Sequence, residues 1–360
     1  RRKGPARGSP SLTLSAAGTY SSPMIAAPIK DARLLSHLDS LAPDGLSFFT
    51  LGSPDGPPGG EIRGALLHGS RLVNRMRANH GLGLIETFVL GQASLASALL
   101  ASTLKGEDRL GIRLDCEGPV QGWSVEAASR PAGNGLERSY ATRGYLFNDV
   151  IELSEAPERF DTAPLVGKGS LTMTRFIAGM PRPFTGTVEL RTGRLAQDLA
   201  TIFLESEQLP TAFELGIHFD REGRVDGAGG LYLQALPGAT ASLLERTETL
   251  LGLPPPIGAY FAGGGNPVAW LGTAFAGLGL TLRGTAAAEF HCDCERGRFA
   301  SFIAGAQGGL LEDLVEKGPW PVEAVCHQCG SRYHWTKEEL ETLLAERSER
   351  RPASPSPGKA

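Results

Sequence analysis

The longest apolar stretch of the chain runs from Ile85 to Leu104, and small residues alternate with leucines along it. It also contains Glu86 and Gln92, which a membrane span of this length would rarely carry. The pattern therefore predicts a helix buried in a protein core. Further helices are predicted from the spacing of their apolar residues over residues 31–41, 71–78, 194–204 and 242–251.

Short apolar runs bounded by glycine and proline make up most of the remaining pattern, as is typical of strands. Strands are predicted over residues 46–51, 61–67, 110–114, 122–126, 139–146, 171–176, 184–190, 213–218 and 231–236. A glycine-rich turn is expected between the last two. Short connections favour antiparallel pairing. The predicted fold class is therefore α+β, with a mostly antiparallel sheet core domain with helices, a metastable helical linker and a small C-terminal four-cysteine zinc domain.

Residues 258–284 combine many glycines with Trp270 and Phe275. Glycine makes ordering expensive in entropy, yet the segment is too apolar for a plain tether. It is predicted to be a metastable linker that docks on another surface. The predicted division is an N-terminal extension (1–43, largely disordered at 1–23, with Met24 as a candidate natural start), an α+β core domain (44–236), the linker (237–288), a zinc-binding domain (289–346) and a disordered tail (347–360).

The composition is that of an ordinary soluble protein. Apolar residues make up 41% of the 360 residues, charged residues make up 21%, and the formal net charge is −4. A negative chain has no general attraction for phosphate backbones, so no nucleic-acid partner is expected. The basic start Arg1-Arg2-Lys3 is not followed by an apolar run, so no signal peptide is predicted. A cytoplasmic protein without a membrane partner is expected.

Four of the five cysteines stand in two close pairs, Cys292-Asp293-Cys294 and Cys326-His327-Gln328-Cys329. Zinc in a closed structural site takes four ligands in a tetrahedron, and paired thiolates in turns can aim two sulfurs at one point. Gly330 supplies the backbone freedom that such a turn needs. The sequence therefore predicts one Zn²⁺ per chain, held by Cys292, Cys294, Cys326 and Cys329. The histidines His291, His327 and His334 are alternative ligands, although four thiols already fill the shell.

No catalytic site is predicted. A four-thiolate site leaves zinc no open position for a water molecule. The other histidines, His37, His68, His80 and His218, have no nucleophile or carboxylate at motif spacing. The fifth cysteine, Cys116, is interpreted as a buried strand residue rather than a reactive thiol.

A purely structural zinc site remains an alternative. The protein would then be a zinc-ribbon module that binds nucleic acid or another partner. This hypothesis requires the ribbon to present basic residues, for which Arg296, Arg298, Arg332 and Lys337 are the candidates.

Over roughly residues 44–345 the chain resembles the heat-shock protein 33 family of redox-regulated chaperones. The resemblance rests on the two cysteine pairs with Tyr333 shortly after them, and on stretches such as Ser206-Glu207-Gln208-Leu209-Pro210 and Ala228-Gly229-Gly230. It departs in the linker, which is richer in glycine and apolar residues than the charged linkers of relatives. That departure leaves the threshold for unfolding of the linker open.

The resemblance implies an ATP-independent holdase that is inactive when reduced and zinc-bound. Oxidation would form the disulfides Cys292–Cys294 and Cys326–Cys329, release zinc and unfold the linker. The active form would bind unfolded client proteins and is expected to be a homodimer, with client-binding residues unknown. The chemistry agrees, because thiolates are the form that oxidants attack. Structural zinc contributes about 10–16 kcal/mol in small metal-folded peptides, while whole domains are stable by only about 5–15 kcal/mol.

Overall fold

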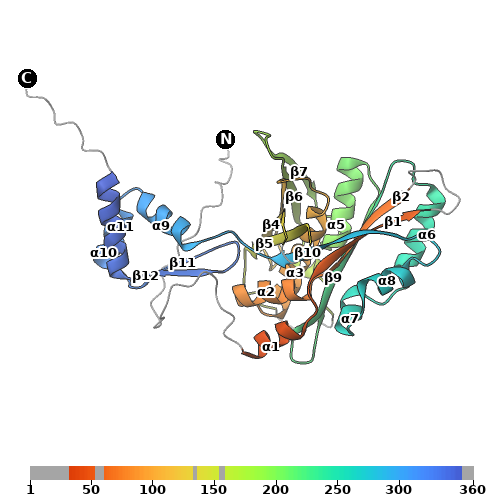
Figure 1. Cartoon of the computed structure of the whole chain (residues 1–360), viewed down its shortest axis with the longest axis horizontal. Helices are drawn as coiled ribbons and strands as arrows, with labels where there is room; N and C mark the ends of the chain where they lie inside the picture. Colours follow the sequence, from red (N-terminus) through yellow and green to blue (C-terminus); the bar gives the residue numbers. More distant parts are fainter. Residues whose placement is uncertain (1–31, 53–60, 133–135, 154–158, 351–360) are drawn as a thin grey trace, which may run out of the picture. The chain divides into compact units, whose positions relative to one another are not determined.

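The computed structural model describes residues 32–52, 61–132, 136–153 and 159–350 (Figure 1). The chain forms two compact units, a larger one that ends at Cys292 and a smaller one that begins at Asp293. The expectations for residues 1–23, for the start at Met24 and for the end of the tail lie outside the described residues.

The larger unit is a mixed α+β fold built on one large sheet (Figure 1). Its elements are α1 (Ala32–Ser40), β1 (Gly45–Gly52), β2 (Glu61–His68), α2 (Ser70–His80), α3 (Leu84–Ala101), β3 (Arg109–Cys116), β4 (Gly122–Pro131), β5 (Arg138–Leu146), α4 (Ala163–Val166), β6 (Gly169–Phe176), β7 (Phe184–Glu189), α5 (Leu195–Ile202), a π-helical turn (Phe203–Glu207), β8 (Thr211–Phe219), β9 (Val225–Ala235), α6 (Ala241–Leu251), α7 (Ile257–Ala262), α8 (Pro267–Ala274) and β10 (Thr281–Phe290).

The sheet has ten strands in the order β7-β6-β3-β4-β5-β10-β1-β2-β9-β8. Every neighbouring pair of these described strands is antiparallel except β10 and β5, which run parallel with Phe290 opposite Thr142. The predicted mostly antiparallel α+β core is confirmed. Strand β10 is the element that joins the two halves of the sheet, although it lies in the segment predicted to be linker.

The predicted core helix is confirmed as α3. Among the described residues it is the one helix long and apolar enough to cross a membrane, and most of it is buried in the folded protein. Leu99 of α3 lies against β9 at Gly230, where an added Cβ would come 2.9 Å from the leucine side chain. Helix α3 thus covers one face of this half of the sheet.

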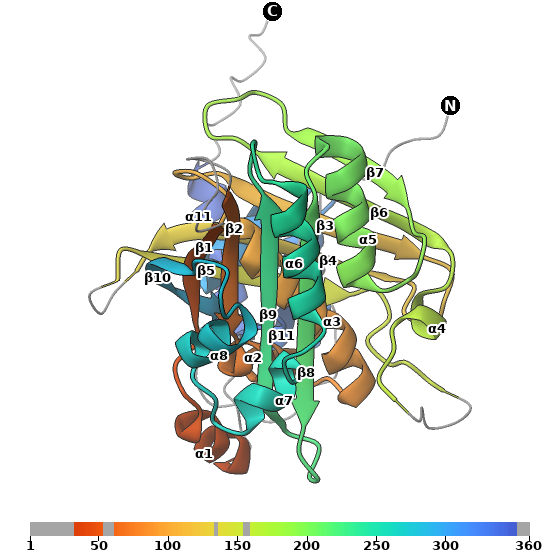
Figure 2. The same ribbon diagram turned by 90° about the vertical axis from the view of Figure 1, so that its right-hand side faces the viewer.

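The opposite face is covered by the helices of the predicted linker, α6, α7 and α8, which Figure 2 shows on the side of the sheet that faces the viewer. Their anchors are large apolar side chains such as Phe261, Trp270 and Phe275, each at most 4% exposed. Side chains from β1, β2 and β9 complete this core, namely Phe49, Leu51, Ile62, Leu66, Leu231 and Leu233. The glycine-rich segment is therefore held in place by burial of its aromatic residues.

The glycine-containing turn predicted between β8 and β9 is present at residues 220–224, where Gly223 has φ +75°, but it is shorter than expected. Strand β9 begins at Val225, so Gly227 and Gly229 lie inside the strand. Helix α7 passes directly over them, and a Cβ added at Gly227 would lie 2.1 Å from the carbonyl oxygen of Gly258. A Cβ at Gly258 would in turn lie 2.9 Å from the backbone of Gly216 on β8. These glycines allow the backbones of helix and sheet to touch.

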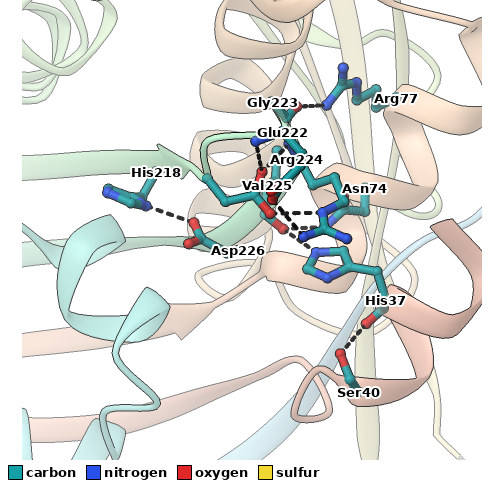
Figure 3. A network of polar contacts seen from close by, with 11 residues as sticks. His37, Ser40, Asn74, Arg77, His218, Glu222, Gly223, Arg224, Val225 and Asp226 are labelled. Atoms are coloured by element: carbon teal, nitrogen blue, oxygen red, sulfur yellow. Dashed lines mark hydrogen bonds and ion pairs between the residues drawn. The ribbon is translucent and has the colours of Figure 1, made fainter. Parts of the chain in front are cut away.

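The turn between β8 and β9 is tied to α1 and α2 by polar contacts (Figure 3). The ring of His37 donates to the carbonyl oxygen of Val225 at 2.8 Å, and the amide of Asn74 donates to the same oxygen at 2.7 Å. His218 pairs with Asp226 at 2.6 Å. These two histidines have structural contacts, as expected for residues outside any catalytic motif.

The smaller unit contains α9 (Arg296–Gly305), α10 (Leu310–Lys317), β11 (Val322–Val325), β12 (Arg332–Trp335) and α11 (Lys337–Arg350). Its last helix begins with a capping box. The backbone N–H of Thr336 donates to the Glu339 carboxylate at 2.9 Å, and the Glu339 N–H donates back to the threonine hydroxyl at 3.3 Å. Helix α11 continues to Arg350, beyond residue 347 where a disordered tail was expected, and Arg347 pairs with Glu312 of α10.

Asp44 is a buried carboxyl that caps α2 from outside the helix. It accepts from the backbone N–H of Arg71 at 3.0 Å and from that of Leu72. His68 lies 3.6 Å away. Burial raises the pKa of the Asp44 carboxyl to about 7, although the two backbone donors act in the opposite direction. The buried carboxyl is therefore expected to make folding stability depend on pH.

Asp44→Asn should flatten this pH dependence. A folded-state pKa of about 7 lies above the ordinary value, so the contribution of Asp44 is fully present below about pH 4 and is lost as the pH rises through 7. The free energy of unfolding of the wild type relative to the variant should fall by up to about 4 kcal/mol across this window. Denaturant titrations of the reduced protein at several pH values measure this difference.

Burial lowers the pKa of His68, which by itself changes stability with pH in the opposite sense. Because His68 lies 3.6 Å from Asp44, the difference between the wild type and Asp44→Asn includes the change in the His68 contribution. Asp39 is exposed, and Asp39→Asn is the matched control that should leave the profile unchanged. Parallel pH profiles for the wild type and Asp44→Asn would contradict the assignment.

Candidate metal centre

The four cysteines of the two predicted pairs lie together. The Sγ atoms of Cys292, Cys294, Cys326 and Cys329 are all within 4.8 Å of one another, and none is in a disulfide. Tetrahedral zinc with Zn–S bonds of about 2.3 Å requires sulfurs roughly 3.8 Å apart. The donor set fits a metal that prefers thiolates, so the arrangement suggests a metal site. Among the described residues, no histidine or carboxylate belongs to this group.

The second cysteine pair is held by a tight turn between β11 and β12. The Cys326 N–H donates to the carbonyl oxygen of Ser331 at 2.8 Å, and the Gly330 N–H donates to that of Cys326 at 2.8 Å. Gly330 has φ +69°, a left-handed conformation that favours glycine. The role predicted for this glycine is confirmed. Both sulfurs of this pair belong to buried residues, whereas Cys292 and Cys294 are half-buried.

Tyr333 contacts the second cysteine of the first pair, Cys294. Its hydroxyl donates to the carbonyl oxygen of Cys294 at 3.0 Å and lies 3.1 Å from the Cys294 sulfur. Burial, together with the neighbouring Cys294, raises the pKa of the Tyr333 hydroxyl, which therefore stays a proton donor. The hydroxyl of Ser331 lies 3.1 Å from the sulfur of Cys329. Such outer contacts orient metal ligands and tune their basicity.

Arg296, two residues after Cys294 in the chain, contacts β12 and the start of the last helix. Its guanidinium donates to the carbonyl oxygen of His334 at 2.8 Å, pairs with Glu339 at 2.7 Å and lies over the ring of Trp335. The capping box of α11 and the start of α9 therefore share one arginine. This residue was considered in the sequence only as a candidate for binding nucleic acid.

The candidate histidine ligands have other surroundings. The ring of His334 contacts the Glu323 carboxylate at 2.9 Å. The backbone N–H of His291 donates to the carbonyl oxygen of Thr142 at 2.9 Å, extending the pairing of β10 with β5. His327 is exposed on the turn of the second pair. None of the three joins the sulfur group.

The remaining sequence candidates are not part of the sulfur group. Cys116 ends β3 and is half-buried rather than fully buried, and burial raises the pKa of its thiol. His68 is buried and hydrogen-bonds Ser70 at 3.2 Å, and the ring of His80 packs edge-on to that of Phe290. These contacts explain the side chains as parts of the fold.

One neighbour of the cysteines could not be found from the sequence. Arg143 on β5 donates two N–H groups to the Glu126 carboxylate, at 2.7 and 3.1 Å, and its third nitrogen lies 3.6 Å from the sulfur of Cys292. Burial alone would lower the pKa of Arg143, but Glu126 and Cys292 raise it above its ordinary value. The two contacting residues are far apart in sequence, and only the parallel register of β10 and β5 brings them together.

Residues 57–336 match the sequence profile of the family described as Hsp33 protein. The 33 kDa chaperonin of Desulforamulus reducens is 33% identical over 274 residues, which cover 76% of this chain and 89% of that protein. The 33 kDa chaperonin of Lactobacillus delbrueckii subsp. bulgaricus is 30% identical over 286 residues, covering 79% of this chain and 94% of that protein.

The same likeness holds in three dimensions. The crystal structure of the 33 kDa chaperonin (heat shock protein 33 homologue) of Thermotoga maritima matches with a TM-score of 0.71 and 28% identity. The match covers 84% of this chain and 99% of that one. On its sequence and its fold alike, the chain belongs to the heat-shock protein 33 family of chaperones.

Proposed function

We propose that this chaperone is an ATP-independent holdase in the cytoplasm, switched on by oxidation of its four clustered cysteines. In the reduced protein Cys292, Cys294, Cys326 and Cys329 hold one Zn²⁺ and the client-binding surface is covered. Oxidation forms the disulfides Cys292–Cys294 and Cys326–Cys329, and the active protein forms a homodimer. The observation that carries the proposal is the convergence of the four sulfurs within 4.8 Å.

The chemistry of the switch is a two-electron oxidation at each cysteine pair. Two thiolates give two electrons to a peroxide, whose O–O bond breaks into two hydroxide ions as the S–S bond forms. A bound Zn²⁺ keeps the four sulfurs deprotonated near neutral pH. The half-buried pair Cys292 and Cys294 is the one that an oxidant reaches more easily.

Loss of the metal is expected to unfold the smaller unit. Its core is small, and its larger buried side chains are Phe299, Ile303, Leu311, Leu314, Val322, Tyr333, Trp335 and Leu340. Binding of structural zinc contributes about 10–16 kcal/mol in small metal-folded peptides, which is as much as the stability of a whole domain. A unit of this size has little else to keep it folded.

The surface that unfolding would uncover lies beneath α6, α7 and α8. These helices bury the apolar face formed by β1, β2 and β9. Phe49 and Leu66 on that face are at most 1% exposed in the closed protein. A continuous apolar face of this kind binds unfolded chains when it is exposed. We therefore assign client binding to Phe49, Leu51, Ile62, Leu66, Leu231 and Leu233, residues that the sequence did not single out.

The zinc-ribbon alternative finds little support in the smaller unit. Arg296 and Arg332 are paired with Glu339 and Glu323. Lys337 lies over the ring of Trp320. Basic side chains engaged within the unit are poorly placed to follow a phosphate backbone.

Treatment of the reduced protein with peroxide and mild heat should release about one equivalent of zinc per chain. The oxidised protein should then suppress aggregation of an unfolding client without nucleotide, because the covered face becomes available. Zinc release is followed with a chromophoric chelator, client aggregation by light scattering, and the disulfides by mass spectrometry of peptides.

Cys116→Ser removes the fifth cysteine, which lies outside the sulfur group, and should switch as the wild type does. Cys292→Ser with Cys294→Ser should abolish the oxidative response. Equal protection of the client by the reduced and oxidised wild type would contradict a redox switch.

Gly258→Ala should make the reduced protein partly active. Its new Cβ would lie 2.9 Å from the backbone of Gly216, so α7 must shift away from the sheet. Overpacking of this kind costs about 1–3 kcal/mol, more than the ~1 kcal/mol that alanine adds to helix propensity. Client aggregation and binding of an apolar dye, both measured without oxidant, report the change.

Gly272→Ala is the matched control. Gly272 lies on the neighbouring helix α8, and an added Cβ there meets no atom within 4 Å. It should stay as inactive as the wild type until oxidised. If Gly258→Ala and Gly272→Ala both fail to suppress client aggregation without oxidant, packing of α7 on the sheet does not limit chaperone activity.

A further inference from the structure

We propose that Arg143 is a positioning residue of the metal centre, which holds Cys292 for metal binding and couples the metal to strand β10. The inference rests on the proposed zinc site but not on chaperone activity. It begins from a contact inside the larger unit, where the Arg143 guanidinium lies 3.6 Å from the sulfur of Cys292.

The side chain of Arg143 is fixed before it meets the sulfur. Glu126, opposite it on β4, accepts two of its N–H groups at 2.7 and 3.1 Å. The arginine side chain is 24% exposed, so water screens the charge only in part. A planar guanidinium held this way presents its remaining N–H groups in one direction. That direction is toward Cys292.

The position of Cys292 is set by β10. Phe290 stands opposite Thr142 in the parallel pairing, and the N–H of His291 still donates to the Thr142 carbonyl oxygen at 2.9 Å. Cys292 therefore leaves the sheet beside Arg143, the residue that follows Thr142 on β5. Binding or loss of the metal at Cys292 therefore acts directly on the end of the pairing between β10 and β5.

The contact between Arg143 and Cys292 stabilises the metal-bound site because the two groups carry opposite charge. Four thiolates carry more negative charge than one Zn²⁺ neutralises, so a half-buried cation beside one sulfur stabilises the assembled site. A sulfur in a disulfide has no such charge, and the contact then loses its ionic part. Through Arg143, the change of Cys292 from thiolate to disulfide therefore alters a contact of strand β5 in the larger unit.

The test is zinc affinity of the reduced protein, measured by competition with a chromophoric chelator. Arg143→Gln should weaken zinc binding by about 10–100-fold, the usual effect of removing an outer partner of a metal ligand. Arg143→Lys keeps the charge and should recover part of the affinity. Arg113→Gln removes a cation from β3 that pairs with Asp115, and this control should bind zinc as the wild type does.

A second readout separates positioning from a general loss of structure. In the wild type, zinc should slow amide hydrogen exchange of β10 between Ala287 and Phe290, and Arg143→Gln should remove that difference. Equal zinc affinity of Arg143→Gln and Arg113→Gln, or a loss that Arg143→Lys does not rescue, overturns the inference while the zinc site stands. A wild type that binds no zinc overturns both this inference and the proposed function.

Discussion

The structure depends on the place of β10 in the sheet. This strand pairs with β1 on one side and with β5 on the other, so it alone joins the two halves of the ten-stranded sheet. It follows the linker helices in the chain, and Cys292 comes two residues after its end. The chain therefore passes from helices α6, α7 and α8, through β10 in the middle of the sheet, to Cys292 of the candidate metal site.

This connection limits what can unfold. The helices α6, α7 and α8 lie on the surface of the sheet, and their release would leave the strand pairs intact. Release of β10 would separate β5 from β1 and break the core itself. We therefore place the proposed uncovering of the client surface in the three helices, with β10 as the part that stays. Elements that move in a switch are drawn from the less stable parts of a fold.

The linker helices α6, α7 and α8 combine one feature that stabilises their packing on the sheet with one that favours their release. Aromatic side chains of α7 and α8 and the residue after them are deeply buried, which stabilises the closed state. Contact between Gly258 and the glycines of β8 and β9 brings backbones together but buries no side chain there. The many glycines of the segment also gain much chain entropy on release. In the proposed switch, helices α6, α7 and α8 can therefore pack closely on the sheet and still be released together.

Much of the fold could be predicted from the sequence. The helix at 84–101, the amphipathic helix near 195 and most strands follow from local periodicity, and the α+β class follows from their order. The grouping of the four cysteines follows from their spacing, because two close pairs of thiols at this separation are typical of a metal site. The capping box at Thr336 and the turn at Gly330 also depend only on near neighbours.

What the tertiary structure decided depends on contacts between distant segments. The apolar pattern begins the strand at Leu231, yet β9 begins at Val225, and its residues Gly227 and Gly229 let α7 approach the strand closely. The sequence assigned residues 281–288 to the linker and residues 289–290 to the zinc-binding domain, yet residues 281–290 form a strand that pairs with β1 and β5. Arg143 and Cys292 meet only through that register. Periodicity reports which face of an element is apolar, but only the folded chain shows what lies against it.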